Sequence, residues 1–342
     1  MSGPPYLPQV SMLGGTPTPI PDDPISAVLM AIFLVAAAAN MYIYRTNKSR
    51  GHFFVFSALL FGFSSARAAA LVFRIAWASR PTNASIAIAA NIFTAAGVLL
   101  LFVINLLFTQ RILRAYFPTF GWSKISYWGF GFFLFSLPAL LVMLIITTIH
   151  SYYTLDINAR MTERNIQLFA GTYLAFLAFL PVPLLLAILA WARKSRTDAT
   201  EIENFGRGQM KTKIALVLFT SLILTFGAGF RIGANFATRP LGNPGWWHHK
   251  ACYYCVNYVI EIIVVYTYML VRFDRRFHVP NGSSAPGHYS GRVPVVVEGA
   301  RAGGSTTVTD EEVFGESVKG SGDSGSGKEG STKRNSAEKE RV

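Results

Sequence analysis

Seven long apolar stretches constrain this chain more than any other feature of its sequence. Each runs for 21 to 27 residues, which is enough for a helix rising about 1.5 Å per residue to cross about 30 Å of hydrocarbon. The chain is 51% hydrophobic and only 14% charged, against about 25% charged residues in soluble domains. The sequence therefore predicts an all-α membrane protein, a seven-transmembrane helix bundle. We expect the spans at 24–44, 53–77, 85–109, 127–149, 166–192, 214–235 and 251–271.

The segments that flank the seven spans differ from them in composition. Residues 1–23 are rich in proline and contain no Lys or Arg, so they lack the basic start of a cleaved signal peptide. We expect the first span to be retained as a signal anchor. Residues 281–342 contain 22 Gly or Ser among 62 positions, a composition typical of disorder. The expected organisation is a short extracytoplasmic segment at 1–23, a seven-transmembrane domain at 24–280 and a disordered tail at 281–342.

The distribution of basic residues predicts the orientation of the bundle. One set of loops carries twelve Lys and Arg and the opposite set carries five. Because basic residues near span ends are retained in the cytoplasm, we expect the N-terminus outside and the C-terminus in the cytoplasm. The net charge of +13 is then explained by loops that meet anionic lipid headgroups. Membrane lipid is the expected partner rather than nucleic acid, and the plasma membrane or an endomembrane is the expected location.

Four charged residues fall inside the predicted spans, where a charge is costly and commonly functional. Arg67 and Arg74 lie seven residues apart in the second span, so they project from nearly the same helix face. Glu261 lies ten residues into the seventh span and Arg231 lies near the end of the sixth. At about 1.5 Å per residue, Arg67 and Glu261 both reach the membrane interior. The depths predict a buried pair between them, with Arg231 and Arg74 nearer the outer mouth.

The seventh span has one polar face. Tyr254, Asn257, Glu261 and Tyr268 follow one another at helical spacings. Together with the arginines, these residues predict an outward-facing polar cavity whose excess positive charge suits an anionic headgroup. The alternative is that the charges only neutralise one another and fix the helix packing. The candidate ligand-binding residues are Arg67, Arg74, Arg231, Asn257, Glu261 and Tyr254.

Small residues and prolines predict local helix geometry. Gly62, Ala66 and Ala70 form one small-residue ridge, and Gly229 and Gly233 form a second, so we expect the second and sixth spans to pack closely. Three prolines within spans predict kinks, at Pro138, Pro181 and Pro183.

The segment at 246–255 combines two tryptophans, two histidines and a C-x-x-C pair. A metal or redox site needs a settled ligand spacing, whereas adjacent His248 and His249 point apart on a helix. An interfacial aromatic belt is the better interpretation, and we expect neither a metal nor a cofactor. The seventh span has no lysine for a retinal Schiff base. The histidines lie in loops, at span ends or in the tail, which argues against a membrane zinc hydrolase. We expect no catalytic residues and no enzyme activity.

Two parts of the sequence resemble a known family. The first part is a stretch of the second span that contains both of its arginines: Ser64, Ser65, Ala66, Arg67, Ala68, Ala69, Ala70, Arg74, Ile75, Ala76 and Trp77. The second part lies in the seventh span and directly after it: Asn257, Tyr258, Val259, Ile260 and Glu261, then Arg272, Phe273, Asp274, Arg275, Arg276, Phe277 and His278. They resemble a fungus-restricted family of seven-span proteins filed as a domain of unknown function, over residues 20–280. The resemblance implies the topology and a fungal membrane.

A looser likeness links Phe230 and Arg231 to the fungal RTA-like lipid-translocating exporters, which have a Phe-Arg pair late in the chain. Those proteins carry a glutamate shortly after the arginine, whereas this chain continues with Ile232 and Gly233 and has its acid at Glu261. No site residue is transferred from that likeness.

The sequence leaves three functions open. The first is a non-enzymatic protein that binds, or translocates, an anionic amphiphile. The second is a receptor or sensor that recruits a cytosolic partner through the basic loop at 193–213 and the tail. The third is a scaffold whose polar residues only specify helix packing.

Overall fold

The computed structural model describes residues 3–6, 10–194 and 202–290, and these are helical over most of their length. Seven helical segments are long and apolar enough to cross a membrane, as expected for an integral multi-pass membrane protein. They run over Pro19–Ser49, Val55–Ser79, Ala84–Tyr116, Lys124–Tyr153, Ile157–Lys194, Met210–Phe236 and Lys250–Leu270. Each contains or largely overlaps one predicted span, so the prediction of an all-helical protein with seven helices long and apolar enough to span a membrane is confirmed for the described residues.

Three spans are divided into shorter helices, and short helices lie between and after the spans. The elements are α1 Pro19–Ser49, α2 Val55–Ser79, α3 Ala84–Gly97, α4 Leu99–Tyr116, α5 Pro118–Gly121, α6 Lys124–Tyr153, α7 Ile157–Phe179, α8 Pro181–Lys194, α9 Met210–Phe236, the 3-10 turn η1 Trp246–His248, α10 Lys250–Tyr254, the π-helical segment η2 Cys255–Val259, α11 Ile260–Leu270 and α12 Phe273–Arg276.

The starts of several helices follow from their caps. The Asn83 side chain accepts hydrogen bonds from two backbone N–H groups at the start of α3, and the Ser123 and Asp156 side chains each accept one at the starts of α6 and α7. Such caps satisfy backbone donors that have no partner within the helix. They place the turns between spans where the apolar stretches end.

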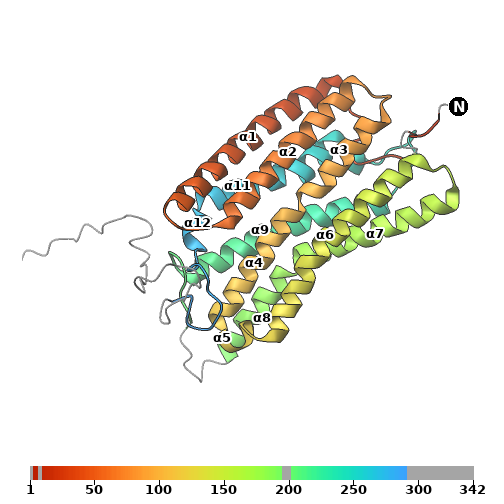
Figure 1. The fold of residues 1–342 in the computed structure, drawn as a ribbon. Coiled ribbons are helices and arrows are strands. Elements are labelled where there is room, and N and C mark those ends of the chain that lie inside the picture. The colour runs from red at the N-terminus through yellow and green to blue at the C-terminus, as the bar shows by residue number, and fades with distance from the viewer. Residues whose placement is uncertain (1–2, 7–9, 195–201, 291–342) are drawn as a thin grey trace, which may run out of the picture.

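The helices form one bundle with two distinct ends (Figure 1). α1 packs along α2, and α7 packs along both α6 and α9, while α11 contacts α1 and α9. The N-terminal end of the bundle is the end where α1 and α10 begin and where α2 and α9 finish. The C-terminal end is the opposite one, which carries α12.

The fifth span divides at a proline, as predicted, whereas the fourth does not. α7 finishes at Phe179 and α8 begins at Pro181, because proline has no N–H to continue the helical ladder. α6 is one continuous helix that passes through Pro138.

The third span divides without any proline, which the sequence analysis missed. α3 finishes at Gly97 and α4 begins at Leu99. A Cβ on Gly97 would lie 2.8 Å from Nε and Cζ of Arg67, and the Thr94 carbonyl in the last turn of α3 accepts a hydrogen bond of 2.6 Å from Arg67 Nη1. The division therefore lies where the arginine of α2 reaches into the neighbouring helix.

The predicted close packing of the second and sixth spans is wrong. α2 packs mainly against α1 and α3, and α9 packs mainly against α7. Gly229 and Gly233 are exposed, and no atom lies within 4 Å of where their Cβ atoms would be. The close approach of α9 to the seventh span occurs instead at Gly227, where a Cβ would lie 3.5 Å from the Val256 carbonyl oxygen.

Packed residues lie on both sides of the predicted seven-transmembrane domain, 24–280. α1 begins at Pro19 rather than at residue 24, and Asp22 is fully buried within it. Beyond residue 280, Tyr289 is buried, with its ring 5.5 Å from that of Trp122 and 5.6 Å from that of Phe205. The packed part of the chain thus continues to residue 290, whereas the rest of the predicted tail, 291–342, lies outside the described residues.

Candidate functional site

Glu261 is at the centre of a buried polar group that we call the inner cluster: Arg67, Arg231, Asn257 and Glu261. Arg67 Nε donates to Glu261 Oε2 and Arg67 Nη2 donates to Oε1, both at 2.5 Å. Neither side chain is more than 1% exposed. The predicted buried pair between the second and seventh spans is therefore present, in the two-bond geometry that carboxylates and guanidinium groups favour.

Arg231 is bound to the inner cluster much more weakly than Arg67. Its Nη1 lies 3.4 Å from Glu261 Oε1 and 3.4 Å from Asn257 Oδ1, near the outer limit of a useful hydrogen bond. One fifth of its side chain, 20%, is exposed. Arg231 is thus the cation of this cluster that can change partners.

The local structure of the seventh span brings its polar residues into the inner cluster. A π-helical segment runs over Cys255–Val259 and ends two residues before Glu261. Such segments insert an extra residue into an α-helix and are frequent at functional sites. Asn257 lies within it and donates from Nδ2 to the Tyr253 carbonyl at 3.0 Å, which leaves its Oδ1 facing Arg231.

A second group, the outer cluster, surrounds Asp22 closer to the N-terminal end: Asp22, Arg74, Lys250 and Tyr254. Arg74 Nη2 lies 3.2 Å from Asp22 Oδ1, and the Tyr254 hydroxyl donates to the same oxygen at 2.6 Å. Lys250 Nζ donates to Asp22 Oδ2. Arg74 and Tyr254 thus belong with Asp22 rather than with Glu261.

Asp22 was missed by the sequence analysis because it lies in the proline-rich stretch before the first predicted span. The unexplained charge of Arg74 was the available signal, since a buried arginine needs an acidic partner. Arg74 also donates to two backbone carbonyls, those of Gly14 at 2.9 Å and Gly15 at 3.2 Å. The segment before α1 is therefore tied to the end of the bundle.

Aromatic hydroxyls connect the two clusters. The Arg74 guanidinium lies 4.4 Å from the centre of the Tyr253 ring, and that of Arg67 lies 5.6 Å from the centre of the Tyr258 ring. The two tyrosine hydroxyls are 3.1 Å apart, and each lies 3.3 Å from Thr94 Oγ1. The clusters are thus neighbouring parts of one polar region.

The balance of charge is the same in both clusters. Each contains one carboxylate and two cations, so each carries a net charge of +1. In each, the arginine from α2 is buried while the second cation is partly accessible, with 20% of the Arg231 side chain and 24% of the Lys250 side chain exposed.

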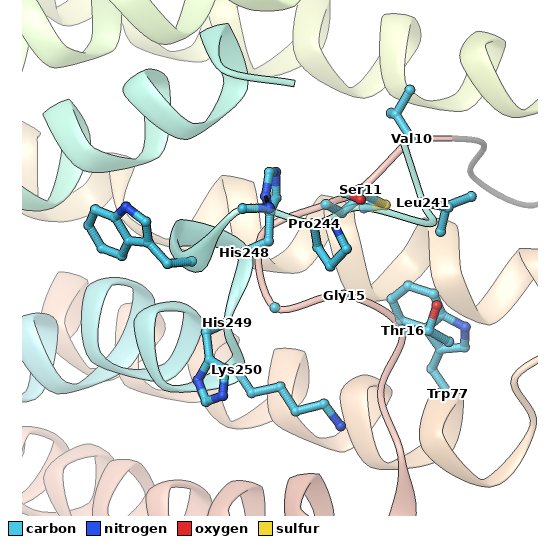
Figure 2. Close-up of a pocket in the computed structure, with 14 residues that line it drawn as sticks. Val10, Ser11, Gly15, Thr16, Trp77, Leu241, Pro244, His248, His249 and Lys250 are labelled. Carbon is cyan, nitrogen blue, oxygen red and sulfur yellow. Dashed lines mark hydrogen bonds between the residues drawn. The ribbon is translucent and has the colours of Figure 1, made fainter. Parts of the chain in front are cut away.

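A cavity of about 510 Å³ lies at the N-terminal end of the bundle. Figure 2 shows its walls, which come from parts of segments 10–16 and 241–250 and from Trp77. Lys250 lines this cavity, but none of the six predicted ligand-binding residues does. This cavity does not lie around Arg67, Arg231, Asn257 and Glu261, so the predicted polar cavity at those residues stays a prediction.

The histidines and cysteines of segment 246–255 make local contacts. His248 Nδ1 accepts a hydrogen bond from the Gly245 N–H at 3.2 Å, and His249 Nδ1 accepts one from the Ala251 N–H at 3.2 Å. Burial lowers the pKa of His248. Both cysteines are free, and among the residues that the structure describes no three His, Cys, Asp or Glu side chains gather as metal ligands would.

A third buried polar group joins α4, α9 and α11, and the sequence analysis identified only its tyrosine. Asn105 Nδ2 donates to Ser221 Oγ at 3.0 Å, and the Tyr268 hydroxyl donates to Asn105 Oδ1. Thr220 Oγ1 lies 2.9 Å from the Tyr268 hydroxyl. This group contains no charge, and its hydrogen bonds satisfy one another, as buried polar groups require.

One comparison with known proteins gave a match. A family model described as "Protein of unknown function (DUF3112)" matches residues 192–278. That stretch contains Arg231, Lys250, Asn257 and Glu261, whereas Asp22 and both arginines of α2 lie before it. No curated protein and no solved structure matches the chain.

Proposed function

We propose that this multi-pass membrane protein binds an anionic amphiphile, with the anionic group at the inner cluster. The observation that carries the proposal is the state of Arg231, which contributes an unneutralised charge, holds two contacts of 3.4 Å and is 20% exposed. A buried charge without full compensation is unfavourable. A monoanion beside Arg231 would bring the cluster to neutrality and offer shorter, charge-assisted hydrogen bonds.

Arg67 and Glu261 have a different role in this proposal. Their mutual hydrogen bonds are short and they are excluded from solvent, so the pair stays intact while Arg231 exchanges Glu261 for the ligand. The Asn257 amide, which contacts Arg231, would hold the guanidinium in place in both states. Translocation of the amphiphile extends this proposal, and neither binding nor translocation requires a metal, a cofactor or a catalytic step.

The proposal includes the orientation and the setting that the sequence favours. The N-terminal end faces outward, because the loops of the opposite end carry twelve of the seventeen loop Lys and Arg. The setting is a plasma membrane or an endomembrane, of a fungus if the family resemblance holds.

The receptor alternative has less support. It requires the basic loop at 193–213 to be available to a cytosolic partner, but Phe205 and Lys213 are buried, and Lys213 Nζ donates to the Phe205 carbonyl. Residues 195–201 and 291–342, which that alternative also uses, lie outside the described residues.

Native mass spectrometry tests the proposal. The full chain is purified in nanodiscs with lipids from the expressing cells, as wild type, Arg231→Gln and Arg80→Gln. Arg80 is an exposed arginine at the same end of the bundle, so its substitution is a matched control for loss of one positive charge.

We expect an anionic amphiphile to be enriched on the wild type and on Arg80→Gln, and to be lost from Arg231→Gln. Identical bound lipids on all three proteins would contradict the proposal.

A further inference from the structure

The cavity at the N-terminal end of the bundle has the features of a binding site. Its volume, about 510 Å³, falls within the range of about 300 to 1,000 Å³ that small-molecule sites occupy. Its walls are largely apolar, with Met12, Trp77, Leu241 and Trp246 among them, and Lys250 is the lysine that lines it. An apolar wall with one cation fits an amphiphile with a single negative charge.

Lys250 can supply that charge recognition because of the outer cluster behind it. Asp22 is shared between Arg74 and Lys250, so one carboxylate faces two cations. Asp23, the next acidic residue, forms no ion pair within the described part of the chain. His248, which also lines the cavity, has a pKa that burial lowers, which disfavours its charged form. Asp22 and the two cations paired with it therefore carry a net charge of +1, and Lys250, with a side chain that is 24% exposed, is the accessible cation of the two.

The outer cluster repeats the arrangement of the inner one. Each has an arginine of α2, placed seven residues apart, which stacks near a tyrosine of the seventh span. Each also includes a polar residue of the seventh span, although the contacts differ: the Tyr254 hydroxyl donates to Asp22, whereas Asn257 Oδ1 accepts from Arg231. Seven residues of helix place the two clusters about 10 Å apart along the bundle.

We propose that the cavity lined by Lys250 is a second anion site, which receives the monoanionic group of an amphiphile before or beside the inner cluster. The ligand has an oxyanion that contacts Lys250 Nζ and an apolar body that contacts the tryptophans of the wall. This inference rests on the function proposed above, because it assigns the same ligand class to both clusters.

The number of ligands per chain tests the inference. The full chain is reconstituted in nanodiscs of phosphatidylcholine and titrated with laurate, a bilayer-partitioning carboxylate, and separately with benzoate, a water-soluble one. Native mass spectrometry counts the bound molecules for the wild type, Lys250→Gln, Lys250→Arg and Arg231→Gln. Leu241→Trp, a substitution at an exposed wall residue, fills the cavity while leaving both clusters unchanged.

We expect two laurate molecules on the wild type and on Lys250→Arg, but one on Lys250→Gln, on Leu241→Trp and on Arg231→Gln. Loss of the charge-assisted contact to Lys250 should weaken the outer site about tenfold or more. Occupancy by benzoate as well as laurate would assign the site to organic acids that arrive from water, and occupancy by laurate alone would assign it to amphiphiles of the bilayer.

Three results would overturn the inference. One is two bound laurates on both Lys250→Gln and Leu241→Trp. The second is a single laurate on the wild type that only Arg231→Gln removes, in which case the proposed function stands and the second site does not. A wild type that binds no laurate also refutes the second site, whereas the proposed function is decided independently by the co-purified ligands.

Discussion

Replacement of Glu261 by glutamine should destabilise the bundle strongly. The substitution preserves the size of the side chain but removes its charge, and it replaces one acceptor oxygen with an NH₂ donor that faces Arg67. Arg67 would lose one of its two 2.5 Å hydrogen bonds to this residue and keep the bond to the Thr94 carbonyl. Both arginines of the inner cluster would then lack a carboxylate.

The expected loss follows from the burial of the pair. The Arg67 side chain is 0% exposed and that of Glu261 is 1% exposed, so solvent cannot screen the uncompensated charges. Removing one partner of such a buried pair costs about 3 to 5 kcal/mol. Removing both, as Arg67→Met with Glu261→Leu, should cost much less, because apolar side chains of similar volume often replace a buried ion pair without loss.

The assay is the free energy of unfolding in mixed micelles, measured by titration with sodium dodecyl sulfate, for Glu261→Gln and for a cycle made of Arg67→Met, Glu261→Leu and their double variant. The control is Glu163→Gln: Glu163 is buried, but its partner His150 has a side chain that is 60% exposed, so solvent reaches this pair and it should contribute less than the fully buried one.

The cycle should give a coupling energy of about 2 kcal/mol or more between Arg67 and Glu261. If each single variant loses no more free energy of unfolding than Glu163→Gln and the cycle shows no coupling, the reasoning is refuted. Breaking the pair would then leave no uncompensated buried charge.

Three further predictions concern other parts of the bundle, two of them beside the clusters and one at the C-terminal end. Gly97→Ala should cost about 1 to 3 kcal/mol in the same unfolding assay, because the new Cβ meets the Arg67 guanidinium at 2.8 Å. The control Gly62→Ala, where the new Cβ has no atom within 4 Å, should cost nothing. Equal effects of the two substitutions would contradict the close contact at Gly97. Asp22→Asn should speed amide hydrogen exchange in residues 10–18, since that carboxylate holds two cations and the Thr18 N–H, and unchanged exchange there would show that other contacts hold the segment. Burial, with a smaller contribution from neighbouring positive groups, lowers the pKa of His278 to about 4. The folded state therefore binds fewer protons than the unfolded state between pH 6.5 and 4, and the free energy of unfolding should fall as the pH falls through that range. His278→Gln should flatten this pH dependence, and an unchanged slope would contradict the assignment to His278.

The hydropathy of the sequence was sufficient to predict the seven spans, and the depth of charged residues was sufficient to pair Arg67 with Glu261. The first prediction rests on the rule that apolar stretches of that length span bilayers. The second follows from it, because a charge deep within such a stretch needs a partner at the same depth.

The features that the sequence did not predict lie where neither of these rules gives a signal. Asp22 is in a proline-rich stretch with no apolar run, and only the extra turn at the start of α1 carries it into the protein. The division of the third span at Gly97 depends on the approach of an arginine from another helix, which no local pattern records. The same holds for the π-helical segment at Cys255–Val259, which changes the phase of the polar face of the seventh span.

Small-residue spacing was misleading for the sixth span. Gly229 and Gly233 have the separation of a packing ridge, but they lie on an exposed face, and the helix uses Gly227 for its close contact instead. Spacing indicates which residues share a face, while the neighbour of that face is decided by the packing of the whole bundle. The cavity at the N-terminal end could not be predicted for the same reason, since its walls come from three distant parts of the sequence.

The most direct test of the central claim is a cryo-electron microscopy structure of the full chain in nanodiscs saturated with laurate. Our account predicts density for a carboxylate in contact with the Arg231 guanidinium, while Arg67 and Glu261 keep their two mutual hydrogen bonds. A structure at the same laurate concentration in which Arg231 still contacts Glu261 and Asn257, with no ligand density beside it, would contradict the proposal that the inner cluster binds an anion.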